Sequence, residues 1–186
     1  EEATTEAAIE TANFVVSRLR DLSGVPENAP DRTARLREFC KQFVTRAFRR
    51  PLTPEQEQAY LTRHFAGDDP EVAVKRLVLL ALKSPAFLYR EAGERPDAYD
   101  VASRLSFGLW DSLPDPELLR AAAAGQLSTR EQVSAQAERM ATDPRTRAKV
   151  REFLLQWLKV DHYPDLAKDK KRFPAFDEAA ATDLRT

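Results

Sequence analysis

Few side chains in this sequence are suited to catalysis or to metal binding. The chain has one cysteine, Cys40, and two histidines, His64 and His162. A metal site needs several ligands at helical or turn spacing, and the sequence has no His-x-x-x-His, Cys-x-x-Cys or Cys-x-x-Cys-His motif. We therefore expect no metal and no cofactor in this segment, and covalent haem attachment within it is excluded.

The catalytic candidates lie together in one polar stretch. Asp161, His162 and Tyr163 could supply a general base oriented by a carboxylate. Residues adjacent in sequence rarely face one another productively, so we favour the alternative that His162 is a polar loop residue. Cys40 shares an apolar stripe with Phe39 and Phe43, where a buried thiol behaves as a small hydrophobic group.

Basic residues gather in one segment and allow two interpretations. These residues are Arg32, Arg35, Arg37, Lys41, Arg46, Arg49 and Arg50. Such a face could bind phosphate or nucleic acid. However, Arg46, Arg49 and Arg50 fall where a helix is expected to end, and cations there offset its negative end. Because the net charge of the chain is only −1, we favour a structural or interaction role and disfavour nucleic-acid binding.

Arg104 poses the same question inside an apolar segment. Asp100 lies four residues before it and Asp111 lies seven residues after it, on the same face of a helix. We expect the stem of Arg104 to lie along apolar surface and its guanidinium to fork between these two carboxylates. This interpretation makes Arg104 a structural strut rather than a ligand-binding residue.

The elements that position these residues are expected to be helices. A capping side chain precedes proline at Thr53-Pro54, Asp69-Pro70, Ser84-Pro85, Asp115-Pro116 and Asp143-Pro144. This pairing is typical of helix starts, and Thr53 with Gln56 and Ser128 with Glu131 also match capping boxes. No segment alternates with a period of two. The prediction is an all-α orthogonal array or bundle of about eight to nine short helices, without significant sheet.

Apolar spacing locates these helices along the chain. Ile9, Ala12, Val16 and Leu19 form the stripe of a first helix, and a second helix is expected from about 32 to 50. Further helices are expected from Pro54 to the residues before Gly67, and at 70–83, 98–111, 116–124, 129–141, 144–160 and 176–186, with 70–83 central to the first half. The clearest stripe lies on 144–160 and consists of Val150, Phe153, Leu154, Trp157 and Leu158.

The composition is that of a globular protein, with 42% hydrophobic and 32% charged residues in 186 positions. No apolar run approaches the roughly 18–20 residues of a membrane span. The segment EAGERPD at 91–97 is the best internal boundary. We expect an N-terminal helix and linker at 1–30, a small helical module at 31–93, and a second helical module at 97–186 that is truncated at its C-terminus. We therefore expect this chain to be a piece of a longer protein.

Four motifs resemble successive signatures of one uncharacterised bacterial family. They are FVTRAFRRPLTPEQ (43–56), LALKSPAFLYR (80–90), ASRLSFGLWDSLPDPELL (102–119) and FLLQWLKVD (153–161), and FPAFDEA (173–179) also fits. The family consists of helical domains of unknown function from large exported planctomycete and myxobacterial proteins, often associated with a planctomycete-type cytochrome c domain. One departure is Gly108, where the family usually has a second aromatic residue. This departure indicates close helix approach or a repacked pocket.

The resemblance implies an exported protein, periplasmic or at the cell surface, with haem c possible elsewhere in the parent chain. It provides no catalytic residues to transfer. Our leading hypothesis is a non-catalytic scaffold or protein-interaction module, whose partner is the remainder of the parent polypeptide or another protein. The alternative is part of a cytochrome-c-associated oxidoreductase or polysaccharide-processing enzyme with its active site completed outside this segment. A third hypothesis is binding of a polyanion through the helix at 32–50.

Overall fold

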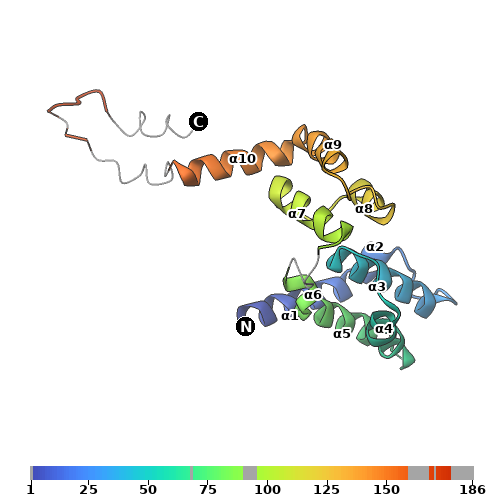
Figure 1. Cartoon of the computed structure of the whole chain (residues 1–186). Helices are drawn as coiled ribbons and strands as arrows, with labels where there is room; N and C mark the ends of the chain where they lie inside the picture. The colour runs from blue at the N-terminus through green and yellow to red at the C-terminus, as the bar shows by residue number, and fades with distance from the viewer. Residues whose placement is uncertain (1, 68, 90–95, 159–167, 170, 177–186) are drawn as a thin grey trace.

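The computed structural model describes residues 2–67, 69–89, 96–158, 168–169 and 171–176, and every regular element among them is helical (Figure 1). The all-α prediction is therefore confirmed for this part of the chain. It contains ten α-helices, of which α2 (Leu19–Ser23), α4 (Pro54–Gln56) and α6 (Pro85–Leu88) are very short. In Figure 1 the helices form two groups, α1–α6 and α7–α10.

The first helical group surrounds α5 (Pro70–Lys83), as predicted. Helices α1 (Glu2–Ser17) and α3 (Arg32–Phe48) both pack against α5. Their shared core contains the fully buried side chains of Leu36, Cys40, Val44, Leu77 and Val78. Asp69 and Ser84 accept hydrogen bonds from backbone N–H groups at the starts of α5 and α6. The proline-and-cap pattern therefore starts these helices as expected.

The stripe predicted for the first helix is correct for Ala12, Val16 and Leu19, which lie in or against the core, and wrong for Ile9. Ala8, Ala12 and Val15 are buried against the core, whereas Ile9 is exposed. The two alanines lie four residues apart and present a narrow face, with which α1 packs against α5. The predicted stripe also continued to Leu19, but Leu19 begins the separate helix α2.

The segment from Pro54 to Ala66 was predicted as one helix and is divided into three. The α-helix α4 continues as the π-helix η1 (Glu57–Thr62), and the 3₁₀-helix η2 (His64–Ala66) follows. The predicted capping box is confirmed, because Thr53 Oγ1 accepts from the N–H of Gln56 and Gln56 Oε1 accepts from the N–H of Thr53. Inserting a wider π turn changes the face that the helix buries.

The second helical group consists of α7 (Ala98–Trp110), α8 (Pro116–Ala123), α9 (Arg130–Ala141) and α10 (Pro144–Trp157). A separate core forms here, built by Ala102, Trp110, Leu118, Ala121, Ala122, Leu127 and Met140. The capping box predicted at Ser128 and Glu131 is wrong by one residue. It is formed by Thr129 and Gln132, because the hydroxyl of Ser128 instead donates to the carbonyl of Gly125.

The expectation for Gly108 is also wrong. Gly108 lies on an exposed part of α7, and a Cβ atom placed there would meet no heavy atom within 4 Å. Neither a close helix approach nor a repacked pocket explains the glycine at this position. The predicted helix at 176–186 lies outside the described residues.

Candidate functional site

Arg49 connects the end of α3 to the segment around α6. It is the C-cap of α3, adopts the left-handed backbone conformation with a φ of 61°, and is only 4% exposed. Its guanidinium lies 5.8 Å from the ring centroid of Phe107, on α7. It donates hydrogen bonds to the carbonyl oxygens of Ala86 (2.8 Å), Tyr89 (2.9 Å), Ala47 (3.1 Å) and Phe87 (3.3 Å). Arg49 therefore fixes three helices of the structure relative to one another.

Arg50 connects the first helical group to the start of α7. Its guanidinium bonds both carboxylate oxygens of Asp97, at 3.0 and 3.3 Å, and one oxygen of Asp100, at 2.6 Å. Asp97 is the N-cap of α7 and accepts from the backbone N–H groups of Tyr99 and Asp100. Burial alone raises the pKa of Asp97, but these N–H donors and the charge of Arg50 bring the pKa below its ordinary value. The carboxylate thus stays ionised at neutral pH.

Four of the other basic residues of α3 are also engaged within the protein. Arg32 pairs with Glu71 and Lys41 with Glu57, each at 2.6 Å. Further bonds join Arg35 to the carbonyl of Gly24 and Arg37 to the hydroxyl of Thr62. Arg46 is exposed in the last turn of α3. These contacts support the structural interpretation of the basic segment over polyanion binding.

In the described part of the chain, Asp100 and Asp111 pair with cations other than Arg104. Asp100 folds back to accept from the backbone N–H of Asp97 and pairs with Arg50. Asp111 follows the end of α7 with a φ of 52° and pairs with Lys149 at 3.1 Å. Arg104 lies on the exposed side of α7. Both carboxylates are thus bound to partners that are distant in sequence, which helical spacing alone did not reveal.

Trp110 positions the start of α10. Its indole N–H donates to the carbonyl of Met140 at 3.0 Å, and the hydroxyl of Thr146 donates to the same oxygen at 2.7 Å. The guanidinium of Arg145 lies 3.6 Å from the ring centroid of Trp110, and that of Arg139 lies 5.7 Å away on α9. Trp110 is buried. The first turns of α10 are therefore held by a hydrogen-bonded and cation–π cluster.

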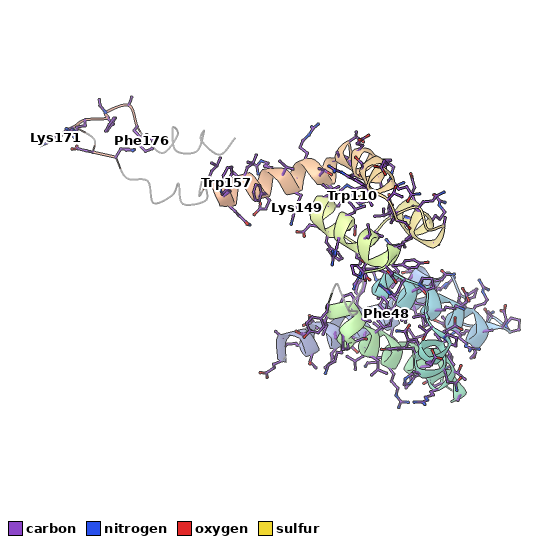
Figure 2. The ribbon with its side chains drawn as sticks, in the orientation of Figure 1. Phe48, Trp110, Lys149, Trp157, Lys171 and Phe176 are labelled. Carbon is purple, nitrogen blue, oxygen red and sulfur yellow. The ribbon has the colours of Figure 1, made fainter. Side chains whose placement is uncertain are left out.

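The later turns of α10 carry an exposed apolar surface, which we call the α10 face. It consists of Val150, Phe153, Leu154, Trp157 and Leu158, whose exposed fractions lie between 40% and 68%. The rings of Phe153 and Trp157 stack with their centroids 6.0 Å apart. Figure 2 shows Trp157 at the far end of α10, well away from Trp110. The sequence identified this stripe, but a stripe alone does not reveal whether the protein itself covers it.

The remaining sequence candidates give no reactive centre in the part of the chain that is described. Burial raises the pKa of the Cys40 thiol to about 12, so the thiol is protonated at neutral pH. Among the described residues, no group of three or more His, Cys, Asp and Glu side chains could hold a metal ion. Asp161, His162 and Tyr163 lie outside the described residues. No helix of the described residues is both long and apolar enough to cross a membrane.

Two regions of the chain match known protein families. Residues 97–186 match the family described as PSD4: Protein of unknown function (DUF1592), and residues 35–91 match the family described as PSD5: Protein of unknown function (DUF1595). No curated protein and no solved structure matches the chain. The expectation that the chain carries domains of unknown function is confirmed.

Proposed function

We propose that this chain is a non-catalytic helical module for protein–protein interaction and that the α10 face is its binding surface. The observation that carries the proposal is the exposure of five large apolar side chains on one side of one helix: Val150, Phe153, Leu154, Trp157 and Leu158. Their spacing of i, i+3, i+4, i+7 and i+8 is the pattern by which one helix contacts another helix or a groove.

The size of the α10 face supports an interaction role. From the exposed fractions of its five side chains, its apolar area is on the order of 500 Å². Soluble monomers rarely expose contiguous apolar patches that are larger than a few hundred Å². The largest apolar patch of a protein is often an interaction site. An exposed area of this kind gives the folded chain no stability, because it is not removed from water.

The way α10 is held also supports the proposal. The main contacts of α10 are with α7 and α9, and in Figure 1 the helix extends beyond both of them. Its first turns are fixed by Trp110, Arg145 and Thr146. A helix whose first turns are already ordered loses less conformational freedom on binding than an unfolded segment, which favours affinity.

Site-specific photo-cross-linking in cells that express the complete gene provides the test. A benzophenone amino acid replaces Trp157 in one variant and Glu152 in the matched control. Both residues are exposed on α10 but lie on opposite sides of it. We expect a defined protein adduct from position 157 and none from position 152. Equal adduct patterns at the two positions, or none at either, would refute the α10 face as a binding surface.

Export and association with a cytochrome c domain are further proposals that depend on the motif resemblance alone. A haem stain of the complete protein, together with fractionation of the cells that make it, tests both. A protein without haem that remains in the cytoplasm would contradict them and would leave the interaction proposal intact.

A further inference from the structure

We propose that the partner of the α10 face is an amphipathic helix whose apolar stripe is flanked by acidic residues. This inference depends on the proposed function and adds the chemical class of the partner. In this proposal the apolar side chains of the α10 face bind the apolar stripe of the partner. The charges at the margins of the face favour an acidic partner over a basic one.

The margins of the α10 face are basic on both sides. Helical spacing places Arg151 beside Leu154 and Leu158, and Lys149 beside Phe153. Arg147 lies one turn before Arg151 and is exposed as well. The acidic residue of this helix, Glu152, lies on the opposite side, where it accepts from Gln156. Arg151 already has an interaction within the chain, but its side chain is exposed. A partner with carboxylates along its stripe would therefore meet cations at both edges.

The pair between Lys149 and Asp111 does not remove this selectivity. The carboxylate of Asp111 is largely exposed, with a side-chain exposed fraction of 69%. Exposed ion pairs are weak because water and salt screen them. The ammonium group of Lys149 can therefore contact a carboxylate of the partner as well.

A second copy of this chain fits the α10 face less well. If two α10 helices paired in antiparallel fashion, each margin would meet the same margin of the other copy, and in a parallel pair the Arg151 margin would meet the Lys149 margin. Cations face cations in both cases.

An anionic membrane surface also fits less well than an acidic helix. The described residues 97–158 contain nine acidic and eight basic residues, so the second helical group has no excess positive charge to attract a membrane. The stripe from 150 to 158 rises only about 12 Å along α10. This length suits a crossing with one partner helix, whereas stable membrane attachment normally needs an additional signal.

The test compares two dye-labelled synthetic peptides of about 20 residues, long enough to form helix. Both carry leucine at i, i+3, i+4 and i+7, and one has glutamate and the other lysine at the flanking positions. Fluorescence anisotropy with the full chain measures binding. We expect the acidic peptide to bind at least ~10-fold more tightly, and we expect the difference to shrink as salt is raised.

Three variants make the result specific. Phe153→Ser with Trp157→Ser should abolish binding of the acidic peptide, and Arg147→Glu with Arg151→Glu should reverse the preference between the peptides. Glu152→Lys, on the opposite side of α10, should leave both affinities unchanged. Circular dichroism must show the same helical content in each variant for the comparison to count.

Several outcomes would overturn the inference. They are equal affinity for the two peptides, no binding of either, and concentration-dependent dimerisation that the Phe153→Ser and Trp157→Ser changes abolish. Co-sedimentation with phosphatidylserine vesicles through the α10 face would instead assign the surface to a membrane. A specific photo-adduct at position 157 without any preference for the acidic peptide would refute this inference alone and leave the proposed function standing.

Discussion

Replacing Arg49 by alanine should destabilise the protein strongly. The change removes the donor to four backbone carbonyls, two of them at 2.8 and 2.9 Å, and it leaves these buried or partly buried oxygens without that donor. Hydrogen bonds to charged groups contribute about 1.5–3 kcal/mol each, and an unsatisfied buried group costs about 1–3 kcal/mol. Because these terms are not additive, we expect a loss of about 3–5 kcal/mol in the free energy of unfolding.

Urea denaturation followed by far-UV circular dichroism measures this loss. For a slope of about 1–3 kcal/mol per molar urea, the midpoint should fall by about 2 M. The matched variant Arg49→Gly loses the same hydrogen bonds but tolerates the φ of 61°. It should therefore be about 1 kcal/mol more stable than Arg49→Ala. Arg46→Ala, at an exposed position of the same helix, should change stability by less than about 0.5 kcal/mol.

A loss below about 1 kcal/mol for Arg49→Ala would refute this reasoning, because that is no more than the effect of an average point mutation. It would mean that water or nearby side chains satisfy the four carbonyls once the guanidinium is gone. The order of the alanine and glycine variants checks the backbone part of the reasoning separately. If glycine were the less stable of the two, the left-handed conformation at position 49 would not be the strained element we infer.

Further predictions concern the connection between the helical groups, the acid limit of stability and the core. A double-mutant cycle of Arg50→Ala and Asp100→Ala should give a coupling energy of about 0.5–2 kcal/mol by urea denaturation, and additive losses would contradict the ion pair. Burial raises the pKa of Asp115, but the hydrogen bond from Arg139 and that from the N–H of Leu118 bring it below its ordinary value. The stability that this carboxylate contributes is thus complete above the unfolded pKa of about 3.9 and is lost as pH falls through the folded value. Asp115→Asn should lower the melting temperature at pH 7 and flatten its decline below about pH 4, and an unchanged acid decline would contradict this assignment. The Cys40 thiol should react with a disulfide reagent at pH 8 only after unfolding, and rapid labelling of the native chain would contradict its burial.

The helices were the part of the structure most open to prediction from sequence. A cap followed by proline fixes a helix start locally, so Asp69-Pro70, Ser84-Pro85 and Asp143-Pro144 begin helices where expected. Register depends on what a helix packs against, and Ile9 is exposed because the small face of Ala8 and Ala12 packs against α5 instead. The one-residue error at Ser128 arose because two adjacent residues each matched a capping box.

The contacts of the arginines could not be read from the sequence. Asp100 has a cation four residues later at Arg104 and another 50 positions earlier at Arg50, and only the fold decides which one it meets. Arg49 was expected to offset the charge of a helix end, yet its acceptors belong mainly to a segment about 40 positions away. The spacing of residues along one helix predicts which of their side chains lie side by side. It carries no information about side chains on a second helix that packing brings close.

The two tryptophans of the chain contribute very differently to the stability of the second helical group. Trp110 is 4% exposed, donates its indole N–H to a backbone carbonyl and is covered by arginine, so stability explains its presence. Trp157 is 68% exposed and stacks only on the neighbouring ring of Phe153 among the ring contacts seen in the described part of the chain. Removing it should cost the fold little, because the burial energy of an indole requires that water be excluded. The proposed interaction accounts for two large aromatic side chains that add little to the stability of the fold, on a helix whose first turns are held by Trp110.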